Sequence, residues 1–278
     1  MLQDWLSEVP VRTEQPRIIA VSSGKGGVGK TNFVANLALF YASINKKVLV
    51  MDADVGLSNI DVLLGVSPKF NLKHVLAGEK RLKETVVTGP LGINIIPAGS
   101  GVRELTKLNE EQRLQLVTEL EDFDLDFDVF LIDTGAGISD NVLFFCSAAQ
   151  EVVVIATPEP TSIADAYALI KVLRNDFKTR HFRLIVNTAR SEREAFETYS
   201  KLSLVADKFL NLPIDYLGYL PFDPAVKDSI IAQKSHIVLY PNSLFAKKLG
   251  QIAKRLIEHP SGDPGGTLQF FLRRALRI

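Results

Sequence analysis

A glycine-rich loop holds the residues of this sequence whose types and spacing point most directly to chemistry. Residues 24–31 read GKGGVGKT and lie between the apolar stretch RIIAVSS and a helical pattern. In this context G-x-x-x-x-G-K-[ST] predicts a phosphate-binding loop, because glycines let backbone N–H groups turn toward phosphate oxygens and the helix start adds partial positive charge. The residues expected to surround a bound nucleotide are Gly24, Lys25, Gly26, Gly27, Val28, Gly29, Lys30, Thr31 and Asn32.

The two lysines of this loop are expected to have different roles. Lys30 should neutralise the β- and γ-phosphates, while the Thr31 hydroxyl should bind Mg²⁺. Lys25 follows the first glycine directly, and one protomer already has enough positive charge to bind a nucleotide. We therefore expect Lys25 to point outward, toward a nucleotide held by a second subunit. The alternative is a solvated surface lysine.

Acidic residues end two of the predicted strands. The run VLVMDAD carries Asp52 and Asp54, and the run FLID carries Asp133 just before the small residues TGAG, a form typical of a Walker B element. We expect Asp133 to hold the magnesium ion through water and Asp54 to orient the attacking water. Asp52 is expected near the metal or the loop lysine. Without the phosphate loop, all three would be interpreted as turn or N-cap residues.

The elements that must position these residues are predicted from apolar runs. Short runs such as RIIAVSS, EVVVIATP and FRLIVNT alternate with longer helical patterns. Continuous apolar character indicates strands buried on both faces, and hence an α/β fold with a mostly parallel sheet flanked by helices on both faces. The order of strand, loop and helix places the ligand site at the carboxyl edge of that sheet.

The chain is expected to contain one large domain and three short segments. Residues 1–16 lack the core pattern and are interpreted as a flexible leader, and residues 17–259 as the nucleotide-binding domain. Residues 260–266 read PSGDPGG and predict a linker. Residues 267–278 predict a short amphipathic helix.

This C-terminal segment has the pattern of an interfacial membrane anchor. At about 100° per residue its apolar side chains gather on one side and its arginines on the other. We expect insertion among anionic lipid headgroups, with packing against its own domain as the alternative. The residues expected to contact the membrane are Leu268, Phe271, Leu272, Arg273, Arg274, Leu276 and Arg277.

Composition limits the classes of partner. Lysine plus arginine and aspartate plus glutamate number 32 each, so no overall positive charge favours nucleic acid. The single cysteine, Cys146, cannot form an internal disulfide or a cysteine-pair metal site. No apolar run reaches the roughly 18 residues that span a bilayer. We expect a cytoplasmic protein, peripheral to the inner face of the cell membrane, with no sequence-specific nucleic acid partner.

Three segments together resemble the MinD/ParA family of deviant Walker A ATPases, a SIMIBI-type branch of the P-loop NTPases. They are KGGVGKT, VLVMDADVGLSNIDVLLG and LIDTGAGIS. Within the family these segments, with IIPAGSG at residues 95–101, most resemble the flagellar-number regulators FlhG, FleN or YlxH, and MinD is the nearest alternative. The resemblance extends from about Ser22 to Asp223.

The resemblance implies roles for individual residues, with ATP or ADP and Mg²⁺ as ligands. Lys25 matches the signature lysine that crosses an ATP-dependent dimer interface, and Asp54 the water-positioning acid. The residues that match the switch segment contacting the partner are Gly56, Ser58 and Asn59, and those that match the adenine pocket are Asn187, Pro221 and Asp223. From residue type alone, Asn187 has an alternative interpretation as a turn former.

One departure from the flagellar regulators lies in the leader. These proteins often carry a D-Q-A-like motif that stimulates a partner GTPase of the FlhF type through a glutamine. The sequence Leu2-Gln3-Asp4-Trp5-Leu6 does not match it, so the role of Gln3 is left open. Other expected partners are flagellar C-ring components or a flagellar transcription regulator.

These expectations combine into a functional hypothesis. ATP with Mg²⁺ drives two protomers into a face-to-face dimer that binds the membrane, and slow hydrolysis dissolves it, which makes the protein a switch that regulates flagellar number or placement. The alternatives are a MinD-type regulator of the division site and a ParA-type DNA-partitioning ATPase. An iron–sulfur carrier would need paired cysteines at the dimer axis.

Overall fold

The computed structural model describes residues 16–54, 59–99, 107–123 and 126–259. Its strands are β1 (Arg17–Ser23), β2 (Val48–Ala53), β3 (Val87–Thr88), β4 (Asn94–Ile96), β5 (Val129–Ala136), β6 (Glu151–Ala156), β7 (Phe182–Ala189) and β8 (Asp215–Pro221). Its helices are α1 (Lys30–Ser43), α2 (Ile60–Leu63), α3 (Leu72–Leu76), α4 (Glu110–Glu121), α5 (Asp140–Ala148), α6 (Pro160–Phe177), α7 (Glu192–Leu210), α8 (Ala225–Ile231), α9 (His236–Leu239) and α10 (Leu244–Glu258), with 3-10 turns η2 (Leu82–Thr85) and η3 (Pro90–Gly92).

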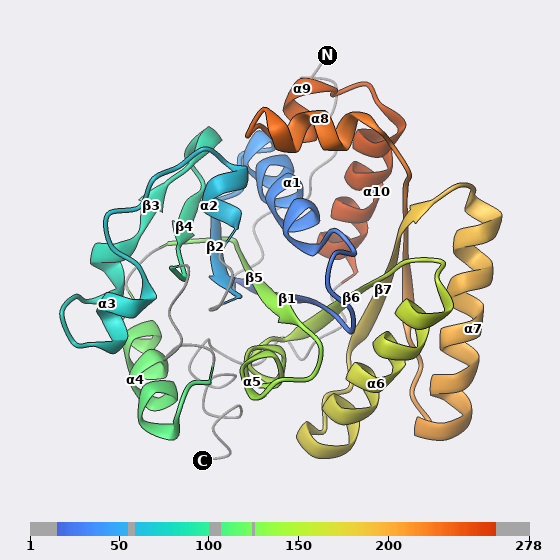
Figure 1. Cartoon of the computed structure of the whole chain (residues 1–278), viewed down its shortest axis with the longest axis horizontal. Coiled ribbons are helices and arrows are strands. Elements are labelled where there is room, and N and C mark those ends of the chain that lie inside the picture. The colour runs from blue at the N-terminus through green and yellow to red at the C-terminus, as the bar shows by residue number, and fades with distance from the viewer. Residues whose placement is uncertain (1–15, 55–58, 100–106, 124–125, 260–278) are drawn as a thin grey trace.

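Within the described residues the strands form one sheet in the order β3-β4-β2-β5-β1-β6-β7-β8 (Figure 1). All neighbouring strands pair in parallel except β3 with β4. The predicted α/β fold with a mostly parallel sheet is therefore confirmed.

The packing around the central strand β1 explains why its residues 18–21 are all apolar. Ile18 and Ala20 pack in one core cluster, with residues of α4, α5, α6 and α7. The alternate residues, Ile19 and Val21, pack in a second cluster with α1 and α10. Because side chains alternate along a strand, a run without polar residues supplies both cores. Figure 1 shows the same two helical layers, one on each face of the sheet.

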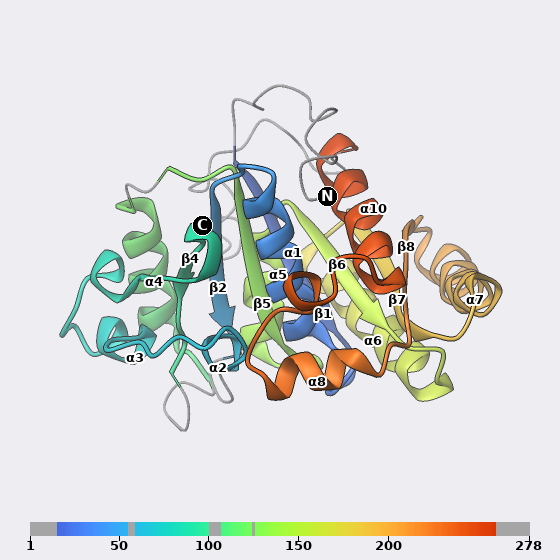
Figure 2. The ribbon, with the colours of Figure 1, turned by 90° about the horizontal axis from the view of Figure 1, so that it is seen from above.

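The carboxyl ends of the parallel strands share one edge, called here the nucleotide edge. Figure 2 shows α2 and α8 at this edge, on the side where α1 begins. The connection after α8 reaches as far as α2, since the Gln233 backbone lies against Gly65. The short elements β3, β4, α8 and α9 were not predicted from the sequence.

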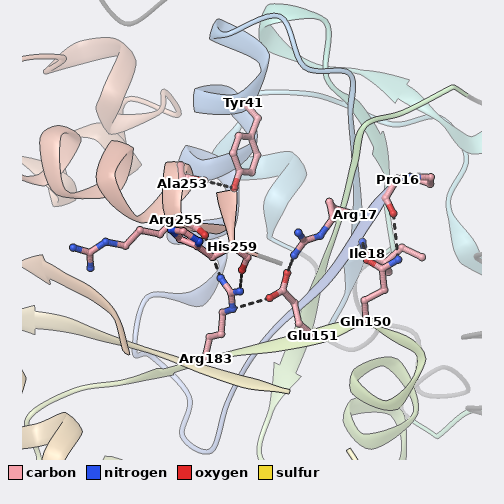
Figure 3. A network of polar contacts seen from close by, with 10 residues as sticks. All are labelled: Pro16, Arg17, Ile18, Tyr41, Gln150, Glu151, Arg183, Ala253, Arg255 and His259. Atoms are coloured by element: carbon pink, nitrogen blue, oxygen red, sulfur yellow. Dashed lines mark hydrogen bonds and ion pairs between the residues drawn. The ribbon is translucent and has the colours of Figure 1, made fainter. Parts of the chain in front are cut away.

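The opposite, amino edge is held by a buried ion cluster (Figure 3). Glu151 is fully buried and pairs with Arg17 of β1 and with Arg183 of β7, whose Nε lies 2.8 Å from a carboxylate oxygen. Arg183 also donates to the carbonyls of Arg255 and His259 at the end of α10. The second arginine thus faces the negative end of a helix dipole, which offsets the surplus positive charge.

Both ends of the described chain lie at this amino edge. Gln150 donates to the carbonyl of Pro16, while the carbonyl of His259 accepts from Arg183. The proposed leader up to residue 15, the linker at residues 260–266 and the helix at residues 267–278 lie outside the described residues. No helix among the residues that the structure describes is long and apolar enough to cross a membrane.

Candidate functional site

The phosphate loop connects β1 to α1 at the nucleotide edge, as the sequence predicts. Helix α1 begins at Lys30, and its N-cap, Gly29, makes no side-chain capping bond. The N–H groups of the first helical turn have no partner within the helix, so they are available to an anion. Lys30 is 8% exposed, which places its ammonium group within the site.

Two glycines of the loop are required by their surroundings. A Cβ at Gly24 would lie 2.1 Å from the backbone of Asp165 in α6. Gly29 has a positive φ of 91°, and a Cβ there would lie 2.4 Å from the amide nitrogen of Asn187. The loop is thus packed directly against α6 and the end of β7, with no space for side chains at these positions.

Asn187 holds the loop in place. Its Nδ2 donates to the carbonyl of Val28 at 2.7 Å, and its Oδ1 accepts from the N–H of Thr188 at 2.9 Å. The side chain is nearly buried and spans the strand end and the phosphate loop. This anchoring role was not anticipated from the sequence, and base reading by Asn187 remains a prediction.

Asp133 is the centre of a buried charged cluster. Its pKa is raised to about 8, first by burial and then by the neighbouring carboxylate of Asp52, with a smaller contribution from Asp54. The positive charge of Lys30 and a hydrogen bond with Thr31 act in the opposite direction. The structure therefore brings Lys30, Thr31, Asp52, Asp54 and Asp133 together from three separate segments.

This cluster fits a divalent cation. The Oδ1 atom of Asp133 is buried without a hydrogen-bond partner. The carboxylates of Asp52 and Asp54 raise the Asp133 pKa, so a cation that bound this oxygen would replace the proton that burial keeps on Asp133. Oxygen ligands are what Mg²⁺ prefers. Thr31 and Asp133 are the residues that would hold it, together with oxygens of the nucleotide.

Asp52 has a structural role that the sequence did not predict, while its expected place near the metal stays a prediction. One carboxylate oxygen accepts the N–H of Asp54 at 3.1 Å, and the other accepts the N–H groups of Asn59 and Ile60 at 3.1 and 3.3 Å. Asp52 thus ties both ends of the segment between β2 and α2 to the site. Two of the predicted switch residues, Gly56 and Ser58, lie outside the described residues. Asp54 lies near Gly135 at the end of β5.

Lys25 forms an ion pair within its own protomer. Its Nζ lies 2.6 Å from Oε2 of Glu159, the N-cap of α6, and 3.4 Å from the Thr161 hydroxyl. The two charged side chains are 41% and 61% exposed. Exposed pairs of this kind contribute little free energy, so the ammonium group is accessible to another anion. Glu159 was missed in the sequence, where the acid in PEPTS after a strand is the only signal.

The residues predicted to contact the adenine lie at the ends of two adjacent strands. Pro221 ends β8 opposite Ala189 of β7, and the Phe222 N–H donates to the Ala189 carbonyl at 3.1 Å. Asp223 accepts the N–H of Ala225 at 3.0 Å, and its other oxygen lies 3.3 Å from Nε2 of His236. The structure thus brings Asp223 to the same edge as Asn187 and the phosphate loop.

A buried polar connection links the phosphate-loop helix to α9. Asn36 donates to the carbonyl of Asn32 at 2.8 Å, and its Oδ1 accepts from the Ser235 hydroxyl and the Ile237 N–H. This connection was not predicted. The signal for it was an asparagine at position 36 within the apolar helical run FVANLALF.

Cys146 belongs to the core. It is completely buried in α5, and burial raises the pKa of its thiol to about 12. A thiol in this state is a poor nucleophile and a poor metal ligand.

Comparisons with known proteins agree with this geometry. A family model described as "ParA: NUBPL iron-transfer P-loop NTPase" matches residues 14–257. The antiactivator FleN of Pseudomonas aeruginosa is 40% identical over 94% of each chain. The flagellum site-determining protein YlxH of Helicobacter pylori is 36% identical over 94% of this chain and 90% of its own.

The fold agrees as well. The crystal structure of the cell division ATPase MinD of Pyrococcus furiosus superposes with a TM-score of 0.73 at 25% identity, over 88% of this chain and 99% of its own. Three findings indicate the same family. The family model matches most of the chain, the two relatives have this identity over nearly the whole chain, and the phosphate loop contains a second lysine. The chain therefore belongs to the MinD/ParA family of deviant Walker A P-loop ATPases.

Proposed function

We propose that this chain is an ATP-dependent dimerising switch that associates with the inner face of the cell membrane and regulates the number or placement of flagella. The flagellar role is supported by FleN and YlxH, which are similar to this chain over almost its whole length. The switch is supported by the site itself. The observation that carries it is the buried Asp133 carboxyl, with one unpartnered oxygen beside Thr31 and Lys30.

The residues of the site have different roles in ATP hydrolysis. Lys30 and the backbone N–H groups of the loop hold the phosphates, and Asp54 orients the attacking water. A bound magnesium ion supplies charge neutralisation for the phosphate oxygens. Asp52 keeps Asp54 in position through the Asp54 N–H.

Lys25 completes the site of a second protomer in this proposal. Its present partner, Glu159, is exposed and offers one carboxylate. A triphosphate on a facing protomer carries more negative charge, so it competes well for the ammonium group. Because charge stabilisation then depends on a second copy, the isolated protomer hydrolyses ATP slowly.

Membrane association is assigned to residues 267–278, whose sequence has an apolar side and an arginine side. The chain leaves α10 at the amino edge, away from the nucleotide edge. A single short helix binds weakly, so pairing two of them in a dimer strengthens membrane binding by avidity.

Phosphate release tests the enzymatic part. Purified protein with ATP and Mg²⁺ is expected to release phosphate slowly, and the Lys30→Ala and Asp54→Ala variants to release at least tenfold less. Asp207→Ala, an exposed change on α7, serves as the control. Equal rates in all four proteins would contradict the assignment of this site.

Vesicle co-sedimentation tests the membrane part. With vesicles that contain anionic lipid, we expect more sedimented protein with ATP than with ADP or without nucleotide. A chain ending at Pro260 should stay in the supernatant in all three conditions. Co-sedimentation of the shortened chain with ATP would show that another surface binds the lipid.

A gene deletion separates the flagellar function from its two alternatives. The structural likeness to MinD favours a division-site regulator as the second candidate. Loss of the gene is expected to change the number or position of flagella and to leave septum placement and plasmid retention normal. Misplaced septa with normal flagella would favour the MinD-type function. Plasmid loss, with salt-dependent DNA binding by the pure protein, would favour the ParA-type function.

A further inference from the structure

Helices α8 and α9 bury polar residues and expose apolar ones. Ser229 of α8 is fully buried, whereas Ile230 and Ile231 beside it are 45% and 70% exposed. In α9, His236 is fully buried while Val238 is 52% exposed. Val226 and Ile237 pack partly against the core, so these helices have apolar side chains on both sides. Large apolar residues on the outer side of a helix are expected where a partner covers it.

Polar contacts hold these helices in this orientation. The Ser235 hydroxyl donates to Oδ1 of Asn36 at 2.7 Å, and the Ile237 N–H donates to the same atom at 3.0 Å. Nε2 of His236 lies 3.0 Å from the Ser243 hydroxyl and 3.3 Å from Asp223. The apolar side chains are thus fixed outward by bonds to the phosphate-loop helix and to the predicted base pocket.

These exposed side chains follow one another along the chain, from just after β8 to the first residue of α10. We name this surface the apolar rim, and it consists of Phe222, Ile230, Ile231, Val238, Leu239 and Leu244. These are six of the fourteen large apolar side chains that are exposed in the described part of the chain. Scattered exposed apolar residues are ordinary, but a cluster of this kind marks a contact surface.

The rim begins at the nucleotide edge. Helix α8 follows directly on Asp223 and ends near α2 (Figure 2). Two further exposed apolar residues, Val62 of α2 and Ile138 after β5, belong to the same edge. The start of the rim thus shares the nucleotide edge with the phosphate loop that carries Lys25.

The charges beside the rim fit a second copy of the same chain. Lys227 and Asp228 of α8 and Lys234 after it are exposed, so the polar border carries both signs. In a two-fold contact such a border is self-complementary, since each copy offers both partners. It matches an anionic lipid surface or nucleic acid less well, because the acidic residue would face like charge.

We infer that the apolar rim is the hydrophobic part of the contact between two copies of this chain in the ATP-bound state. This inference rests on the proposed nucleotide-dependent dimer and names the surface that stabilises it. Lys25 makes the contact depend on nucleotide, and the rim supplies the apolar burial that stabilises it.

A pair of matched double variants tests the inference. Ile230→Ser with Ile231→Ser removes two side chains of the rim, and Leu204→Ser with Phe209→Ser removes two equally exposed ones on α7. Sedimentation equilibrium with a non-hydrolysable ATP analogue and Mg²⁺ gives the dimer dissociation constant. A two-fold contact contains each substituted side chain twice. The rim variant is therefore expected to dimerise at least about a hundredfold more weakly than wild type. The α7 variant should stay within about twofold of wild type.

The possible results distinguish a failure of the rim inference from a failure of the proposed dimer. A wild-type protein that stays a monomer with the analogue would contradict the proposed switch. A wild-type dimer with an unchanged constant in the rim variant would overturn the rim alone. Normal dimerisation of the rim variant with loss of vesicle binding would make the rim a lipid contact and also overturn the inference.

A measurement on the unmodified protein removes any dependence on variant folding. Hydrogen exchange of residues 225–240 is expected to slow with the ATP analogue, and more so as protein concentration rises. Exchange in α7 should not change with concentration. Protection of residues 225–240 that is independent of concentration would show that nucleotide alone orders the segment, and would count against the rim as a dimer contact.

Discussion

The buried carboxyl of Asp133 destabilises the empty protein and is also the group expected to bind a ligand. A buried carboxyl beside Asp52, with an unpartnered oxygen, costs free energy in the nucleotide-free chain. The same group becomes useful when a cation is present. The residues that carry the proposed chemistry are thus also those that should limit the stability of the empty protein.

Replacing Asp133 with asparagine should reveal both effects. The folded-state pKa is raised to about 8 from an ordinary 3.8, so the folded protein holds a proton that the unfolded chain releases, and wild-type stability falls as pH rises between these values. Asp133→Asn removes this cost. Without nucleotide, its melting temperature should exceed that of wild type, by more at pH 7 than at pH 4.

The same variant should bind nucleotide less well with magnesium. Calorimetric titration with ADP is expected to show the Mg²⁺-dependent part of the affinity reduced at least about tenfold. Asp207→Asn on the exposed face of α7 is the control for both measurements. Unchanged magnesium dependence in Asp133→Asn would remove Asp133 from the metal site.

His236 gives a pH dependence of opposite sign. Its pKa is lowered from 6.5, mainly by burial, and Asp223 acts against this shift. The unfolded chain therefore takes up a proton before the folded protein does, so stability should fall as pH decreases below about 6.5. Thermal denaturation should be measured from about pH 7.5 to about pH 5. Over this range the melting temperature is expected to fall less for His236→Gln than for wild type. Exposed His181 provides the matched change, and a His181→Gln protein that lost the same slope would contradict the assignment to His236.

At the scale of elements, the sequence predicts what local pattern determines. The strands β1, β2, β5, β6, β7 and β8 follow from apolar runs because each is buried on both faces. The phosphate loop follows from its spacing. The two-residue β3 and three-residue β4 are too short to show any period. Helix α9 was missed because it has only four residues, and it buries His236 while it exposes Val238 and Leu239.

Contacts between distant segments account for the rest of the site. Lys25 and Glu159 are separated by 134 residues, and Asn36 and Ser235 by 199. Nothing in either local sequence specifies the other partner. The sequence indicated which residues have chemical roles. The residues that hold them in position could be identified only in the folded structure.

The phosphate loop offers a matched pair of glycine variants. Gly24 has the backbone of α6 at 2.1 Å from the position of a Cβ, whereas Gly26 has nothing within 4 Å. Gly24→Ala is therefore expected to cost about 2 kcal/mol or more in the free energy of unfolding, and Gly26→Ala less than about 0.5 kcal/mol. Denaturant unfolding measures both. Equal stability of the two variants would show that the loop is not packed on α6 as described.

In the complete domain, the two edges of the sheet carry different groups of residues. The nucleotide edge carries the phosphate loop, Lys25 and the apolar rim. The amino edge carries the buried cluster around Glu151 and both described chain ends, Pro16 and His259 (Figure 3). A dimer formed at the first edge would leave the second edge, with Pro16 and His259, uncovered.

In the proposed switch ATP joins two copies of this chain through Lys25, and sedimentation velocity measures this association directly. The protein of 30.7 kDa should sediment as a single chain with ADP and as a dimer with a non-hydrolysable ATP analogue and Mg²⁺. Lys25→Ala should bind ADP as wild type does and remain a single chain with the analogue. A Lys25→Ala protein that dimerised as tightly as wild type, or a wild type that never dimerised, would contradict the account.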